Sequence, residues 1–494
     1  MRGKNELSAT FVCAAEIRRD LHSTRRHFAD INIDESPDFV KASCGKPAAR
    51  MEKTASLCYD RGMKVAIVGG GAAGLMAAAT IQELDPVAEI FVLERNPTLG
   101  KKILLTGGGR CNVTTGLQDV RAVLAKYPRG GKFLSSAMHA FTPKAAYDWF
   151  EARGVPLKVE EDLRVFPISN SGKDIVGIFE ALFRTPKTHL LLSAQVTRIE
   201  KQKELFVITI KGRQERLLVD IIILTTGGQA YRETGSTGDG YAFAASLGHT
   251  ITPLAPSLNA FFTMETWPAD LSGISFKHTT ISAKHGKKAS VTGPFLFTHK
   301  GVSGPAVFAL SSLLAFASYE PKNPLEINID LFPDAAQDAF IKILEEAIAS
   351  QPKKSLLNAL ALIVPKSLAE VLCRALSIQE KKRAAECGKK DLLRIAGWLK
   401  GIPLRVKGRD AGDEFVTAGG VHLKEVNPST MESLLCPGLF FAGEILDIDG
   451  FTGGFNLQSA WATGRLAGRR VAEQSLKKAA CHVEFTLGGN RFSS

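Results

Sequence analysis

A short apolar strand, a glycine turn and an alanine-rich helix follow one another near residue 64 of this 494-residue chain. The segment reads KVAIVGGGAAGLMAAATIQEL, with its strand from Val65 to Val68, and a second strand in EIFVLER ends at Glu94. This order predicts two parallel strands joined by a crossover helix. Such a strand–helix–strand unit is typical of dinucleotide-binding α/β folds.

The glycines of the turn meet separate requirements. Gly69 permits a tight turn, Gly71 lets the backbone approach a pyrophosphate, and Gly74 allows the helix to lie close to the strand. The N-terminus of the helix offers free N–H groups to phosphates. Glu94 stands where a carboxylate accepts hydrogen bonds from ribose hydroxyls and would repel a 2′-phosphate. The pattern predicts the adenosine diphosphate part of FAD or NAD, and disfavours NADP.

A second part of the same site is predicted near the C-terminus. The string GLFFAGEILDIDGFTGGFNLQSAWATGRLAGRRVAEQ contains a strand over 439–442, a glycine-acid turn at 443–444 and a long helix. In a glutathione-reductase-like flavoprotein, such a helix points its N-terminus at the pyrimidine end of the flavin. Reduced flavin is negatively charged there, and the N–H groups of Asn456, Leu457 and Gln458 are candidates to stabilise it.

A third segment, VDIIILTTGG, predicts another strand of this sheet. It follows a β-meander whose expected strands include HLLLSAQVTRIE and LFVITIKG, with Val196 near the adenine. Each segment alone is also explained by ordinary α/β architecture. The order of the three along one chain favours FAD over NAD.

The length and the 45% hydrophobic content allow more than one core, since cores rarely grow beyond roughly 250–300 residues. We assign 63–255 and 408–478 to an FAD-binding domain. A β-rich substrate domain is expected over 256–332 and 403–407, where β-branched and polar residues alternate between Gly and Pro turns. Residues 333–402 are expected to form a basic helical cap.

The remaining features bear on the setting of the protein. Residues 1–62 lack periodicity and precede Met63, which resembles a natural start, so they are interpreted as a disordered tail, a docking arm or a non-native leader. Residues 479–494 are a tail. No apolar run approaches the ~18 residues of a membrane span, and the eight cysteines show no metal or disulfide pattern. We expect a cytoplasmic protein that binds neither a metal nor a membrane. Its net charge of +12 is a weak indication of a polyanionic partner.

Several longer strings resemble one family. They are ERNPTLGKKILLTGGGRCNVTT, GSTGDGY, FTHKGVSGPA, VTAGGV and GFTGGFNLQSAWATG, spread over about residues 63–475. They resemble the YhiN-type flavoproteins, also described as the BaiN or aminoacetone-oxidase-like family of NAD(P)/FAD-dependent oxidoreductases. Some members are ribosomal RNA dihydrouridine synthases. The resemblance implies an α/β flavoenzyme with a glutathione-reductase-like, two-segment FAD-binding Rossmann domain, an inserted β-rich domain and a helical cap.

The resemblance also implies a set of flavin contacts. By similarity they are Gly69, Gly70, Gly71, Ala72, Ala73, Gly74, Glu94, Arg95, Lys102, Gly108, Arg110, Cys111, Asn112, Val196, Gly228, Gly443, Glu444, Gly454, Asn456, Leu457 and Gln458. The glycines of TGGGRCN let the backbone lie against the flavin ring. Arg110 is expected to hold a pyrophosphate or the charge of the reduced ring.

Two side chains are candidates for a proton donor. Cys111 is either an acid beside the ring or a small buried residue packed under it, because a reactive thiol needs exposure and a cationic neighbour. His299 either faces the substrate or packs in a turn. The sequence leaves both choices open.

The leading hypothesis, suggested by the resemblance, is that reduced FAD converts a uridine of ribosomal RNA into dihydrouridine. Flavin N5 would donate hydride to C6 of the unstacked base while Cys111 or His299 protonates C5. NADH or NADPH would supply the electrons transiently at the substrate side, since no second GxGxxG motif is evident. The basic run IQEKKRAAECGKKDLLRIAGWLKG is compatible with RNA phosphates, with Trp398 stacking on a base or filling the core of the cap.

Two alternatives from other classes remain. One is a small-molecule flavoenzyme, either an amine oxidase or a reductase of an enone-like lipid or steroid. The other is a flavin-containing assembly factor that binds ribosomal RNA without turnover. The oligomeric state is not predicted.

Overall fold

The computed structural model describes residues 62–379, 381–409 and 414–488, and the side chains as far as residue 478. The expected leader, apart from Gly62, and the last six residues of the expected tail lie outside these ranges. Within the described residues, no helix combines the length and apolarity that a membrane crossing requires.

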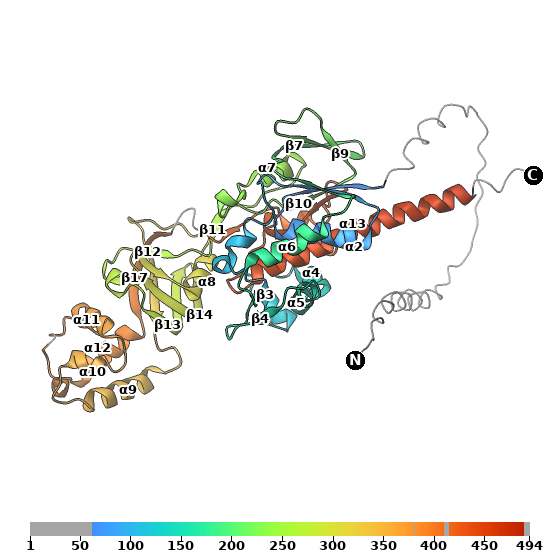
Figure 1. Ribbon diagram of the computed structural model, residues 1–494. Coiled ribbons are helices and arrows are strands. Elements are labelled where there is room, and N and C mark those ends of the chain that lie inside the picture. The colour runs from blue at the N-terminus through green and yellow to red at the C-terminus, as the bar shows by residue number, and fades with distance from the viewer. Residues whose placement is uncertain (1–61, 380, 410–413, 489–494) are drawn as a thin grey trace, which may run out of the picture. The chain divides into compact units, whose positions relative to one another are not determined.

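The first core is built around a parallel sheet of five strands (Figure 1). Their order is β19 (Leu439–Phe441), β10 (Ile221–Leu224), β1 (Lys64–Val68), β2 (Glu89–Leu93) and β6 (Thr188–Leu191). The aliphatic residues of β1 and β10 are buried, as expected for parallel strands covered on both faces. The strand predicted near the C-terminus therefore returns to the first sheet, and the two-segment Rossmann fold is confirmed.

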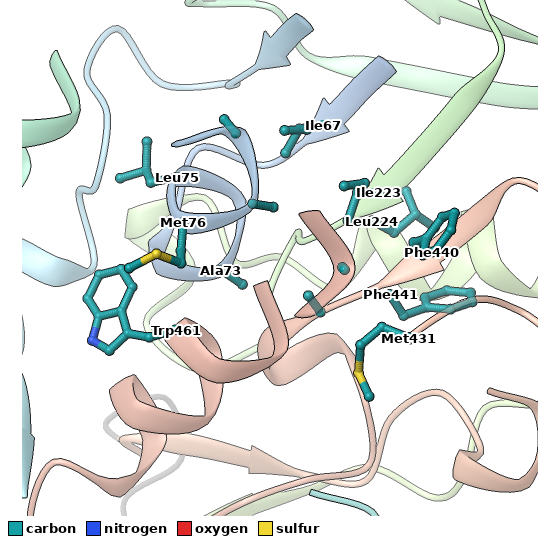
Figure 2. Packing of buried hydrophobic residues seen from close by; sticks show 14 of the residues in the cluster. Ile67, Ala73, Leu75, Met76, Ile223, Leu224, Met431, Phe440, Phe441 and Trp461 are labelled. Carbon is teal, nitrogen blue, oxygen red and sulfur yellow. The ribbon is translucent and has the colours of Figure 1, made fainter. Parts of the chain in front are cut away.

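Two helices pack against each other beside this sheet. Helix α2 (Ala72–Leu84) connects β1 to β2, and the long helix α13 (Phe455–Gly488) packs against it. Gly464 allows this contact, because a Cβ atom there would lie 2.3 Å from the Ala73 carbonyl oxygen. Figure 2 shows Met76 of α2 and Trp461 of α13 directed toward one another within the same core.

The expected meander differs from the observed one at its first strand. HLLLSAQVTRIE forms two strands, because Ser193 adopts a left-handed conformation with φ of 52° and breaks the extended chain. Its first part is β6 of the parallel sheet. The meander consists of β7 (Val196–Gln202), β8 (Leu205–Ile210) and β9 (Leu217–Val219).

The remaining elements of this part of the chain surround the sheet. They are β3 (Thr114–Thr115), α3 (Val120–Leu124), α4 (Ser135–Ala140), α5 (Pro143–Glu151), β4 (Leu157–Val159), β5 (Arg164–Pro167), α6 (Gly172–Leu182) and α7 (Asp239–Ser246). A short 3₁₀ helix, η2 (Ile103–Gly109), follows the loop after β2.

The inserted segment contains a closed antiparallel barrel. Its strands, in order, are β12 (Phe261–Thr263), β15 (Gly301–Ser303), β14 (Lys287–Thr298), β13 (Ser275–His285), β16 (Leu325–Asp330) and β17 (Ile402–Arg409). Helix α8 (Pro305–Leu313) packs on β14. The barrel is linked to the Rossmann part by the paired strands β11 (Ala255–Ser257) and β18 (Val416–Ala418).

The described residues between β16 and β17 form four α-helices. They are α9 (Gln337–Ala349), α10 (Leu356–Leu360), α11 (Lys366–Ala375) and α12 (Lys389–Leu399). Their buried side chains, such as Leu344 and Leu372, belong to the same hydrophobic cluster as Phe295 and Ile327 of the barrel. The segments that we expected as a β-rich domain and a helical cap therefore share one core.

Candidate active site

A cavity of about 990 Å³ lies where the parallel strands end. Gly69, Glu94, Thr225 and Gly443, which follow β1, β2, β10 and β19, all line it. Its volume is at the upper end of the roughly 300–1,000 Å³ of ligand pockets. The carboxyl ends of parallel strands are where open α/β sheets bind their ligands. The cavity therefore has the position and the size for a large cofactor.

The glycine turn after β1 has the expected geometry. Gly69 has a φ of 114°, and a Cβ atom at Gly74 would lie 2.0 Å from the Gly69 carbonyl oxygen. Beside Gly71, in contrast, there is open space. No side chain of the described residues caps α2, whose first residues line the cavity, so its positive end faces an incoming ligand.

The carboxylate of Glu94 is fixed at the end of β2. It accepts hydrogen bonds from the backbone N–H of Gly70 at 2.8 Å and from both the backbone and the side-chain nitrogen of Asn96 at 2.8 and 2.7 Å. The residue is 8% exposed and lines the cavity. Glu94 thus stands at the place predicted for ribose recognition.

Two charged pairs hold separate segments of the cavity wall. Arg95 pairs with Asp239 at 3.1 Å and so connects the end of β2 to the GSTGDGY segment. Lys102 pairs with Glu444 at 2.8 Å, and Glu444 also accepts a hydrogen bond from the backbone N–H of Thr417 at 2.9 Å. Segments far apart in the sequence are therefore joined around one cavity.

A second helix N-terminus opens onto the same cavity. Gly454, with φ of 89°, precedes α13, and Asn456 and Leu457 line the cavity beside it. Gln458 departs from the prediction. Its backbone N–H donates to the Gly454 carbonyl at 2.9 Å, and its buried side chain bonds to Thr114 and to the carbonyl of Phe141. Its N–H group is therefore not available to a ligand.

FAD matches this arrangement, since its pyrophosphate and its reduced ring both carry negative charge. The turn over 69–73 would hold the pyrophosphate, Glu94 the ribose, and the N–H groups of Asn456 and Leu457 the pyrimidine end of the flavin.

Most of the predicted cofactor residues line the cavity. Those that do are Gly69, Gly70, Gly71, Ala72, Ala73, Glu94, Arg95, Lys102, Gly108, Asn112, Val196, Gly443, Glu444, Gly454, Asn456 and Leu457. Those outside the lining are Gly74, Arg110, Cys111, Gly228 and Gln458. Gly228 lies behind the wall, since a Cβ atom there would be 2.5 Å from the Thr417 hydroxyl.

Arg110 does not occupy the place expected of it. Its guanidinium pairs with Glu160 at 2.7 Å and lies over the ring of Phe166, 3.8 Å from the ring centre. The charge of Arg110 is thus paired with a carboxylate, and the residue is not among those that line the cavity. The expectation that Arg110 holds a pyrophosphate or the reduced ring is not supported by its position.

The two candidate proton donors are also outside the cavity lining. Cys111 is fully buried, and burial raises the pKa of its thiol to about 12. This placement favours the packing interpretation over the acid. His299 is exposed in the turn between β14 and β15. Trp398 is half-buried against the barrel-side core and near Trp267, which favours its interpretation as a core residue.

Sequence reasoning missed an apolar part of the cavity wall. It is formed by Leu258, Pro294, Pro305, Phe308 and Phe415, from the inserted segment and its linkers. The rings of Phe308 and Phe415 meet edge to face at 5.0 Å. The available signal was the position of Phe308 and Phe415 beside the strings FTHKGVSGPA and VTAGGV, but single phenylalanines have no spacing that marks a pocket.

The sheet, the two-segment site and the cavity define a flavoprotein oxidoreductase of the Rossmann type. The chain belongs to the family described as the HI0933-like protein Rossmann domain, whose model matches residues 63–470. This confirms the resemblance found in the sequence.

Three curated relatives are similar over most of their length. The 3-dehydro-bile acid delta(4,6)-reductase of Clostridium scindens is 32% identical over 83% of this chain and 99% of its own. The ribosomal RNA dihydrouridine synthase of Haemophilus influenzae is 30% identical over 83% and 98%. The protein of the same name from Escherichia coli is 28% identical over 80% and 95%.

Proposed function

We propose that this chain reduces a carbon–carbon double bond conjugated to a carbonyl group, in the cytoplasm and at the expense of NADH or NADPH. Bound FAD supplies the hydride transfer. The two kinds of activity named for its relatives, a delta(4,6)-reductase and a dihydrouridine synthase, both add hydrogen to such a bond. The protein's own part is to bind, orient and shield the reactants.

The observation that carries this proposal is the composition of the cavity wall. The N-termini of α2 and α13 and the apolar side chains of Leu258, Phe308 and Phe415 line the same cavity. The two helix N-termini would stabilise the negative charge of FAD, which leaves the aromatic and aliphatic side chains for the substrate. Such side chains favour a planar, weakly polar ring, and a conjugated carbonyl compound has this property. The proton is assigned to neither Cys111 nor His299, since both lie outside the lining.

The leading substrate is a uridine of ribosomal RNA. Exposed cations are frequent in the inserted segment, for example Lys381 before α12 and Lys389 and Lys390 in its first turn. Part of the positive charge of the helical segment is neutralised within that segment, because Lys382 pairs with Asp391 at 2.7 Å. The support for RNA therefore comes from the exposed cations and from the two relatives that are dihydrouridine synthases.

A cyclic enone of steroid size is the second candidate. The apolar wall of Leu258, Pro294, Pro305, Phe308 and Phe415 favours it, because a hydrophobic ring system loses its contact with water there. The bile acid reductase is also similar to this chain over nearly all of its own length.

The deciding experiment is mass spectrometry of ribosomal RNA from cells with and without this gene. Wild-type protein and a Gly71→Asp variant are returned to the deletion strain. Loss of one dihydrouridine, restored only by the wild type, is the expected result. An unchanged RNA profile overturns the uridine substrate. Turnover of a 3-keto-4-ene steroid by the purified, NADPH-reduced protein would then support the second candidate.

A further inference from the structure

The hairpin of β13 and β14 ends in a group of four basic residues. The two strands pair from Ser275 opposite Leu296 to His285 opposite Lys287, with Gly286 at the turn. The neighbouring strand β16 pairs with β13 only as far as Ala283. The last residues, Lys284, His285, Lys287 and Lys288, therefore extend beyond the part of β13 that is paired with β16; we call them the hairpin tip.

The hairpin tip places two like charges directly opposite each other. Lys284 is paired with Lys288 across the strands, and Lys287 lies next to Lys288, opposite His285. Like charges in opposing positions destabilise a sheet. All four side chains are exposed, and none of the ion pairs found within the described residues includes any of them. Elsewhere on the surface, cations such as Lys144 do have an acidic partner.

The hairpin connects this charge to the cavity. Pro294 lines the cavity and lies on β14, seven residues after Lys287. At about 3.4 Å per residue, the strand spans on the order of 24 Å between them. A small anion cannot contact both places at once. A polymer with regularly spaced negative charges can hold its backbone at the tip and present one unit to the cavity.

We propose that the hairpin tip binds the phosphate backbone of the RNA whose target base enters the cavity. This inference rests on the proposed function. It assigns a docking surface to the RNA that the proposed function requires. Phosphate contacts of this kind position a nucleic acid without reading its sequence. The local cost of opposing like charges is offset when phosphates lie between them.

The test removes three positive charges from the hairpin tip. It compares the effect on RNA binding with the effect of removing three positive charges elsewhere on the surface. One variant carries Lys284→Gln, Lys287→Gln and Lys288→Gln. The control carries Lys203→Gln, Lys211→Gln and Arg213→Gln, three exposed residues in the turns that connect β7, β8 and β9 of the meander. Binding of a fluorescent oligouridylate to each FAD-loaded protein is followed by anisotropy over a series of salt concentrations.

We expect the tip variant to bind about tenfold more weakly than wild type. Its slope of log affinity against log salt should fall by about 2, since each single-strand phosphate contact contributes about 0.7. The control should keep the wild-type slope. Equal losses in both variants, or no binding by the wild type, would overturn the proposal. The proposal would also be overturned if the tip variant lost binding to phosphatidylserine vesicles but kept its affinity for RNA. That result would assign the hairpin tip to a membrane surface.

Bleaching of the flavin by NADPH separates the two proposals. It needs no RNA, and we expect it to be the same in the wild type and both variants. If the tip variant loses RNA affinity while no pyridine nucleotide bleaches the flavin of any protein, the docking surface stands and the proposed reaction fails.

Discussion

The guanidinium of Arg129 is paired with the carboxylate of Asp449, whose side chain is fully buried. Ser257 of β11 and Ser312 of α8 donate to the same carboxylate at 2.7 and 3.1 Å. Asp449 stands two residues before a stretch, 451–454, that lines the cavity. This buried pair therefore joins the cavity wall of the Rossmann part to the inserted barrel.

Replacing Arg129 by methionine leaves the Asp449 carboxylate buried without its cation. We expect the free energy of unfolding to fall by about 3–5 kcal/mol, as for other broken buried pairs. Urea denaturation followed by circular dichroism measures it. The control is Lys144→Gln, which breaks an exposed pair with Asp148 and should cost less than about 1 kcal/mol. Equal effects of the two changes would contradict the importance of the buried pair.

Two glycines of the first turn should respond in opposite ways. Gly71 has open space beside it and an extended backbone with φ of −87°, so Gly71→Asp should fold and yet lose FAD through repulsion of the pyrophosphate. Gly74→Ala should fail to fold stably, because its Cβ atom would lie 2.0 Å from a carbonyl oxygen. Flavin absorbance of the purified proteins and their melting temperatures distinguish the two effects. A flavin-loaded Gly71→Asp protein would refute the site.

The thiol of Cys111 should be unreactive in the folded protein. A pKa raised from 9.0 to about 12 lowers its thiolate fraction about a thousandfold at neutral pH, and full burial excludes reagents as well. Iodoacetamide labelling with peptide mass spectrometry should modify the half-buried Cys387 before Cys111. Cys111→Ala should keep its turnover with the enzyme's substrate. A large loss of turnover at constant stability would restore the acid interpretation.

Stability should fall as the pH decreases through the ordinary pKa of histidine. Burial lowers the pKa of His249 from 6.5, against the opposing effect of Glu425 nearby, and Ser433 bonds to its ring nitrogen at 2.8 Å. The unfolded chain therefore binds the proton more readily. This stabilisation is complete above pH 6.5 and is lost below it, by at most about 1.4 kcal/mol per pH unit.

Urea denaturation at several pH values between about 7.5 and 5.5 checks this, with His249→Gln as the control that lacks the titrating group. The variant should show a flatter pH dependence than the wild type. Identical slopes would mean that His249 keeps its ordinary pKa.

The parts of the site that use backbone geometry were predictable from the sequence. Gly69 and Gly74 lie where only a residue without a side chain fits, and Glu94 follows a strand by a fixed number of residues. These requirements act over short distances along the chain, so they leave a spacing that can be recognised. The same holds for the strand that returns at Leu439, since its aliphatic run and acidic turn form one local pattern.

The positions of long side chains were not predictable in the same way. Arg110 belongs to a glycine-rich string, yet its direction is decided by Glu160 and Phe166, about fifty residues away in the sequence. The cavity wall around Phe308 depends on how α8 meets the linker that carries Phe415. In both cases tertiary contacts decide between orientations that the local sequence allows equally.

During synthesis, β1, β2, β6 and β10 leave the ribosome long before β19 and α13, because the whole barrel and its helices are made between them. Until then β10 has an unpaired edge, and the surface of α2 that Gly464 approaches is open to water. The flavin cavity needs Gly443 and Gly454 and so closes only after the barrel and its helices have been made. We therefore expect FAD to bind only after the inserted segment has been made, and the sheet edge at β10 to be open to wrong pairing until β19 covers it.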